Sequence, residues 1–210
     1  MTIPAKTAAG MGALGTAAGG GVLLSKSPLF SKQTPTLRKE VEDDGWVLLT
    51  SSNTTEIQSI LGAYKKDNPK ATLLLDGLTG GESDASEKLL QICKGLQEKP
   101  TDAPSKEDLL AKLKKWCVVP KTTKQRLTEL GYSPLSTDNP SNGTESQEWK
   151  AKGTNHHGSQ QGKFAGVETN GDENERAKKL REHCKTKLEV KSFEEEFNDT
   201  FSKVKNWCTN

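Results

Sequence analysis

Large apolar and aromatic side chains are scarce in this chain of 210 residues, of which 31% are hydrophobic and 5% aromatic. Leu, Ile, Val and Phe together fall just under the level of about 20% below which a stable core becomes doubtful. The formal net charge of +2 supplies little of the self-repulsion that keeps charged chains unfolded. The composition therefore predicts modest folded units separated by polar, unfolded segments.

Several functional motifs are also missing. No clustered excess of Lys and Arg is present to neutralise phosphates, which argues against a nucleic-acid-binding protein. Structural zinc sites usually contain a C-x₂₋₄-C pair, and the sequence has none. Gly77, Gly80 and Gly81 lack the Lys-Ser/Thr that follows in a phosphate-binding loop. We therefore expect no metal, no cofactor and no catalytic residue.

The first 25 residues form a Gly/Ala-rich segment without a charge from Thr7 to Ser25. That length nearly reaches the roughly 20 residues that span a bilayer, although the many glycines make insertion only marginally favourable. A membrane anchor, a secretory signal peptide and a flexible leader are the three interpretations. We favour a single-pass anchor in the cell membrane, followed by a non-helical, proline-containing linker over residues 26–36.

The four cysteines reveal an internal repeat, because Cys93 and Cys117 have the same spacing as Cys184 and Cys208. A shift of 91 residues also superimposes the Trp-Cys dipeptides that end each pair. Upstream, Gly45-Trp46 corresponds to Gly131-Tyr132 at a shift of 86. The body is therefore predicted to be two tandem helical units over residues 37–120 and 121–210, with a polar insertion at about 136–175 in the second unit.

Apolar spacing predicts that these units are mainly α-helical. Phe193, Phe197, Phe201, Val204 and Cys208 recur on one face of a helix, and Ser192 with Glu195 resembles a capping box before it. Shorter helices are predicted over Thr55–Lys66 and over Thr122–Leu130, the latter closed by Gly131.

Two segments look like strands and two look unstructured. Ala71–Leu75 is a short apolar run before a turn, and Trp46–Thr50 is a second candidate, but neither has an evident partner. Ser136–Glu148 and Gly153–Glu175 are rich in Asn, Gly, Ser and Gln. We expect these two segments to be disordered or to form long mobile loops.

The chain resembles a known group of proteins in the segment KWCVVPKTTKQRL (Lys115–Leu127), in the terminal Trp207-Cys208, and in the leader MTIPAKTAAGMG with its GGGVLLS. These motifs are similar to those of the large paralogous families of uncharacterised proteins in haemotropic mycoplasmas. The resemblance implies no reaction or substrate. It implies a wall-less bacterium, whose expanded paralogue sets are suspected surface antigens.

The cysteines Cys93, Cys117, Cys184 and Cys208 are disulfide candidates if the body is extracellular, and buried thiols if it is cytoplasmic. The repeat favours the pairs Cys93–Cys117 and Cys184–Cys208. A simple helical hairpin, however, would separate the second pair by well over about 10 Å along the axis, more than the roughly 7 Å between Cα atoms that a disulfide tolerates. Either the Trp-Cys end folds back, or the helix boundaries differ, or the cysteines pair otherwise.

Zinc binding and thiol catalysis are the alternative roles for these side chains. A zinc site would use Cys184 with His183 and one of His156 and His157, but two adjacent histidines in a polar stretch are usually exposed. A catalytic thiol needs a base nearby in space, and His183 points away from Cys184 on a helix. We therefore expect a non-enzymatic protein.

Two hypotheses for the function follow. In the first, the chain is a membrane-anchored, surface-displayed helical protein with an interaction or antigenic role, whose host or protein partner is unknown. In the second, it is a membrane-tethered cytoplasmic scaffold or regulator with reduced cysteines. The second rests on the basic residues after the leader, because the positive-inside bias would keep them in the cytoplasm.

Overall fold

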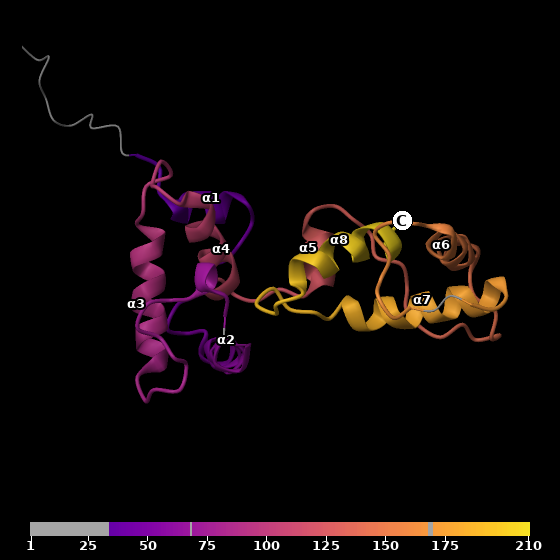
Figure 1. Ribbon diagram of the computed structural model, residues 1–210, viewed down its shortest axis with the longest axis horizontal. Helices are drawn as coiled ribbons and strands as arrows, with labels where there is room; N and C mark the ends of the chain where they lie inside the picture. The colour runs from indigo at the N-terminus through magenta and orange to yellow at the C-terminus, as the bar shows by residue number, and fades with distance from the viewer. Residues whose placement is uncertain (1–33, 68, 168–169) are drawn as a thin grey trace, which may run out of the picture. The chain divides into compact units, whose positions relative to one another are not determined.

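The computed structural model describes residues 34–67, 69–167 and 170–210, and in this part of the chain regular structure is entirely helical (Figure 1). The helices are α1 (Leu37–Asp43), α2 (Thr54–Asp67), the 3-10 helix η2 (Ala71–Leu73), α3 (Ala85–Gln97), α4 (Lys106–Trp116), α5 (Thr123–Glu129), α6 (Gln147–Gly158), α7 (Glu173–Lys187) and α8 (Phe197–Trp207). The mainly α fold class is confirmed. The predicted anchor lies outside the described residues, as does the linker apart from its last three residues.

Helices α1 and α5 begin the two halves of the body in the same way. Each has seven residues and is followed, two positions later, by a glycine with a positive φ, 79° at Gly45 and 83° at Gly131. A positive φ favours glycine because it has no Cβ. α5 begins with a capping box, in which the Thr122 hydroxyl accepts from Gln125 N and the Gln125 side chain accepts from Thr122 N.

The loops of the two halves pair in equivalent ways. Leu49 N donates to Cys117 O at 3.0 Å, and Leu135 N donates to Cys208 O at 2.8 Å. Isolated antiparallel bridges occur at equivalent places, namely Thr36 with Pro100 and Leu48 with Val118 in the first half, and Thr122 with Lys191 and Pro134 with Thr209 in the second. These short pairings bring the start of each half to its end.

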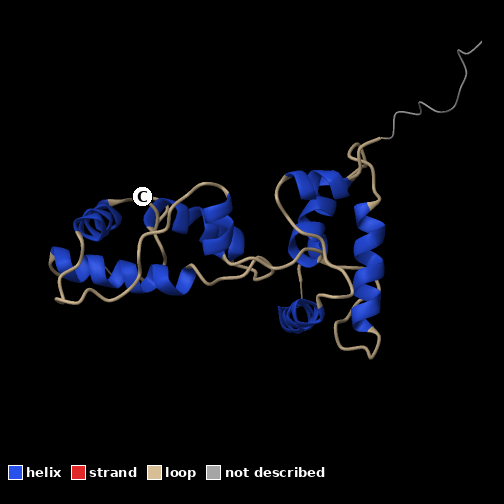
Figure 2. Cartoon of the chain, turned by 180° about the vertical axis from the view of Figure 1, so that it is seen from behind, coloured by secondary structure: helices blue, strands red, loops and turns tan. Residues whose placement is uncertain are grey.

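The two strand-like segments form no β-ladder among the described residues. Leu73 ends the single 3-10 turn η2, and its carbonyl accepts from Trp116 Nε1 at 2.9 Å. Trp46–Thr50 contributes one isolated bridge, at Leu48. Figure 2 accordingly draws only helices and loops in the part of the chain that the structure describes. An apolar run with no partner strand does not form a ladder, and it is packed here by a tryptophan side chain.

The prediction of long unstructured loops is wrong for part of the polar stretch. Helix α6 occupies Gln147–Gly158, and the Ser146 hydroxyl caps it by accepting from Trp149 N at 3.3 Å. Gly153 lets α6 approach α7 closely, because a Cβ there would lie 2.7 Å from Ala177 N. Close backbone contact thus takes the place of the apolar side chains whose absence suggested disorder.

The last helix begins later than its periodicity predicts. α8 starts at Phe197 and not near Phe193, and its N-cap residue makes no side-chain capping bond. Ser192, the predicted cap, instead accepts from Lys121 N through its hydroxyl at 3.3 Å. Because this residue pairs with the start of the second half, the segment before α8 forms turns and not a continuous helix.

Buried side chains form two clusters. The larger contains residues of α1 to α4 and also Val190, Phe193 and Phe197, whereas the smaller includes Leu127, Trp149, Leu180 and Val204 together with the second pair of cysteines. Phe201 packs against both clusters. None of the described helices combines the length and apolar character that crossing a membrane requires.

Candidate functional site

All four cysteine candidates are bonded in the structure, in the pairing that the repeat favoured. The Cα atoms lie 5.3 Å apart in Cys93–Cys117 and 5.7 Å apart in Cys184–Cys208. The geometric difficulty with the second pair disappears because the helix boundaries differ from those expected. The segment between α7 and α8 leads the chain away before α8 returns, so that Cys208 directly follows its last residue.

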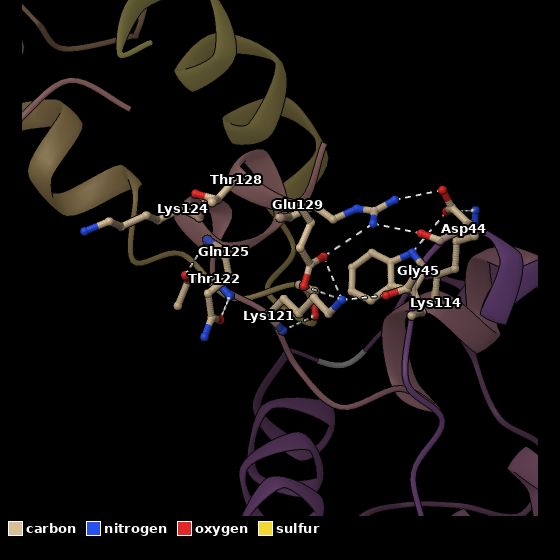
Figure 3. Close-up of polar contacts among 12 residues, drawn as sticks. Asp44, Gly45, Lys114, Lys121, Thr122, Lys124, Gln125, Thr128 and Glu129 are labelled. Atoms are coloured by element: carbon tan, nitrogen blue, oxygen red, sulfur yellow. Dashed lines mark hydrogen bonds and ion pairs between the residues drawn. The ribbon is translucent and has the colours of Figure 1, made fainter. Parts of the chain in front are cut away.

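Two basic side chains from the start of the second half bind the end of α1. Lys121 Nζ donates to Gly45 O at 2.6 Å and pairs with Glu129 at 2.7 Å. Arg126 donates to the backbone carbonyl and to Oδ1 of Asp44, both at 2.8 Å. Figure 3 shows Lys121 placed between Gly45 and Glu129. We call this group of contacts the junction.

Trp46 packs against both cations of the junction. The Arg126 guanidinium lies 4.7 Å and Lys121 Nζ lies 5.4 Å from its ring centroid, and its Nε1 donates to Asp44 Oδ2 at 3.1 Å. Burial by itself raises the pKa of the Asp44 carboxyl, but the hydrogen bond from Lys114 and the charges of Lys114 and Arg126 hold it below its ordinary value. Asp44 therefore stays ionised and can accept the hydrogen bonds of Arg126 and Trp46.

A cleft of about 340 Å³ lies beside the junction. This volume is at the lower end of the range found for small-ligand pockets. The residues that matter for its chemistry are Trp46, Leu73, Lys114, Lys115, Glu195 and Phe197. The cleft thus combines apolar walls with charges of both signs.

Lys115 is a partly buried charged group of this cleft, and no ion pair among the described residues balances its burial. Its Nζ lies over the Trp116 ring, 4.9 Å from the centroid. Desolvation lowers its pKa, and it outweighs the attraction of Asp67 and Glu195. Glu195 is bonded at 3.1 Å to Lys70. An anionic group that entered the cleft would meet an under-compensated ammonium group beside apolar side chains.

The prediction that the paired histidines are both exposed is wrong for His156. This side chain is fully buried, and its Nε2 accepts from Phe164 N at 3.1 Å. Its ring contacts Trp207 edge-on, with centroids 5.0 Å apart. Desolvation, followed by the charge of Lys163, lowers the pKa of His156 from 6.5 to about 4. His157 is exposed.

The components of the zinc hypothesis are not brought together. The Cys184 sulfur is bonded to Cys208, and the His183 ring packs against Phe164 with centroids 4.5 Å apart. Among the residues that the structure describes, no three His, Cys, Asp or Glu side chains are grouped so that they could hold a metal.

The second half contains a buried ion pair that no pattern in the sequence indicated. Arg181 and Glu145 are each 3% exposed at the side chain and bond through Arg181 Nη2 and Glu145 Oε1 at 2.9 Å. Arg181 Nη1 also donates to Thr137 O and Asn139 Oδ1, both at 3.1 Å. The pair fastens the loop before α6 to α7.

Comparison of the chain with protein-family models, with curated proteins and with solved structures finds no match. Inference about its function therefore starts from its own residues.

Proposed function

We propose that the protein is a membrane-anchored, surface-displayed helical protein with an interaction or antigenic role and without catalytic activity. The observation that carries this proposal is the pair of disulfides at equivalent places in both halves. Disulfides persist in oxidising environments and are rare in reducing cytoplasm. An extracellular body also agrees with a small apolar core, since cross-links compensate for limited burial.

We further propose that the two halves are tandem copies of one unit. α1 and α5 have equal lengths, as do α4 and α8, and the loops around them form equivalent hydrogen bonds. The resemblance to paralogous families of haemotropic mycoplasmas, whose expanded sets are suspected surface antigens, belongs to the same proposal. In this view the Gly/Ala-rich leader is the anchor.

A non-catalytic role is supported by what the reactive side chains do. Each cysteine is part of a disulfide, so none offers a thiolate. The buried imidazole of His156 faces aromatic rings and a backbone N–H. Neither arrangement pairs a nucleophile with a base, which covalent catalysis requires.

We propose the cleft beside the junction as the place where a partner binds, through a carboxylate next to an apolar group. The carboxylate would pair with Lys115, and the apolar group would pack on Trp46 and Phe197. A suitable probe is 3-phenylpropanoate, with its primary amide as the neutral analogue of the same shape. We expect the carboxylate to bind at least about tenfold more tightly, as measured by tryptophan fluorescence.

Two variants locate that binding. Lys115→Gln should remove the preference for the carboxylate over the amide, whereas Lys124→Gln, on the exposed surface of α5, should leave it intact. Equal affinity of the unmodified protein for both probes would eliminate the cleft as an anion site, even if either variant folded poorly.

The extracellular location is tested separately from the cleft. Cells are alkylated before lysis, and mass spectrometry then scores the four cysteines. We expect quantitative Cys93–Cys117 and Cys184–Cys208 bridges, and cleavage of the body by protease added to intact cells. Four alkylated thiols and a protected body would instead support the tethered cytoplasmic scaffold, which the basic residues after the leader favour.

A further inference from the structure

One tertiary contact is formed by different side chains in the two halves. In the first half the Tyr64 hydroxyl accepts from Leu75 N at 2.8 Å, and the Tyr64 ring lies edge-on to Trp116 at 5.0 Å. In the second half His156 Nε2 accepts from Phe164 N, and its ring lies edge-on to the tryptophan before the last cysteine, also at 5.0 Å. Each contact ties a loop to a long helix and to a Trp-Cys end.

The two side chains respond differently to acid. A tyrosine hydroxyl has acceptor lone pairs while it keeps its proton, so it can accept this hydrogen bond without losing a proton. An imidazole nitrogen can accept from an N–H group only while it carries no proton. His156 Nε2 must therefore lose this bond when the ring becomes protonated.

We infer that His156 makes the second half of the body acid-labile while the first half is not. Protonation would place two N–H donors face to face, Nε2 of His156 and the amide of Phe164. The resulting charge would be fully buried between aromatic rings. The loop around Phe164 would separate from α6, and the Trp207 ring would lose its packing partner.

The surroundings offer the charged ring no compensation. The ionisable groups that act on it are Lys163 from the following loop, His183 from α7 and His157 from its own helix, and each disfavours a further positive charge. Nδ1 of His156 is buried and has no hydrogen-bond partner in the part of the chain that the structure describes. No carboxylate is among the groups that act on this ring.

The direction of the effect follows from proton linkage. In the closed state the pKa of His156 is about 4, below its ordinary value of 6.5, so the open state binds the proton more readily. Opening is therefore unaffected above pH 6.5 and becomes easier as the pH falls from 6.5 to 4. Between pH 7 and pH 4.5 we expect the protection factor of the Phe164 amide to fall roughly fiftyfold.

Amide hydrogen exchange on the full chain at these two pH values tests the inference. The variants swap the two side chains between the halves. In His156→Tyr the Phe164 amide should keep its protection in acid. In Tyr64→His the Leu75 amide should become acid-sensitive. His157→Tyr, at the exposed neighbouring position, should behave like the unmodified protein.

Two outcomes would overturn the inference. One is acid lability that persists in His156→Tyr but disappears in His183→Gln, which would assign the effect to α7. The other is a proton NMR titration of the unmodified protein in which the pKa of His156 is no lower than its ordinary value of 6.5. That titration needs no substitution, so it decides the matter even if a variant fails to fold.

Discussion

The two halves fix their long helices in place with different kinds of side chain. Helix α2 buries Ile57, Ile60, Leu61 and Tyr64 in the larger core, whereas α6 buries only Trp149, Gly153 and His156. Yet both helices reach the tryptophan that precedes the second cysteine of their half. The same frame, by which we mean the disulfide and the loop pairings of each half, thus accommodates buried side chains that are either apolar or partly polar. We call these buried side chains the filling.

Helix α7 also buries a charged residue where the first half has an apolar one. Leu90 and Arg181 occupy equivalent positions, each three residues before the first cysteine of its half. Only Arg181 needs a buried carboxylate as its partner. A polar network costs more than an apolar contact when it is incomplete, because each unpaired member remains desolvated. The second half should therefore be the more fragile one, and substitutions can test this.

The largest effect is expected from Arg181→Leu, which places the first half's residue in the second. It would leave Glu145 buried without its partner and should cost about 3–5 kcal/mol in the free energy of unfolding. Adding Glu145→Leu removes the orphaned charge and should recover most of that loss. Urea unfolding of the single and double variants measures both values, and a double variant no more stable than the single one would contradict this account of the pair.

Removal of each disulfide compares the two cores directly. Both bridges join cysteines 24 residues apart, so loop closure predicts a similar loss for each, about 3.5 kcal/mol in the chain-entropy model. Because the apolar cluster of the second half is smaller, Cys184→Ala/Cys208→Ala should unfold that half first. Cys93→Ala/Cys117→Ala should leave both halves folded at 25 °C.

Hydrogen exchange distinguishes these outcomes, since it reports each half separately. We expect amides of α7 to exchange freely in the first double variant and amides of α3 to stay protected in the second. If α3 loses its protection at least as readily, the apolar cluster does not supply the extra stability that we assign to it.

The sequence predicted the frame better than the filling. The repeated spacing of the cysteines favoured the pairing that the structure has, and Gly131 marked the end of α5, because a cross-link and a positive φ each restrict the choice of residue. The helical character of α6 was missed because its apolar residues are few. It becomes visible when Ile57, Leu61 and Tyr64 are aligned with Trp149, Gly153 and His156, which retain the spacing but not the chemistry.

The junction and the cleft could not be predicted for a different reason. Arg126 and Asp44 are 82 residues apart, and in the sequence each looks like an ordinary surface charge, Arg126 within α5 and Asp44 just after α1. Their contact depends on how the two halves meet, which no local pattern encodes. The repeat does contain one clue, because Arg126 stands where the first half has Glu40 and Asp44 stands where the second half has Leu130. Charges that differ between equivalent positions are candidates for contacts between the halves.

A smaller effect is expected from two glycines, one in each long helix. Gly153→Ala would push a Cβ to within 2.7 Å of Ala177 N, and this overpacking should cost about 1–3 kcal/mol. Gly62 in α2 has no atom within 4 Å of the added Cβ. Gly62→Ala should therefore stabilise the protein by about 0.5–1 kcal/mol through its higher helix propensity. Thermal unfolding monitored by circular dichroism should give shifts of opposite sign.

The smallest loss of stability is expected at the junction, from Arg126→Lys. A lysine keeps the charge but cannot bond the Asp44 carbonyl and carboxylate together while stacking on Trp46. We expect a loss of about 1 kcal/mol and faster exchange of amides near Gly45, with α3 and α7 unchanged. Lys124→Arg, at an exposed position of the same helix, is the matched control. Because the two halves keep separate disulfides, weakening the junction should leave each half folded, and a cooperative loss of both would show that neither half is stable alone.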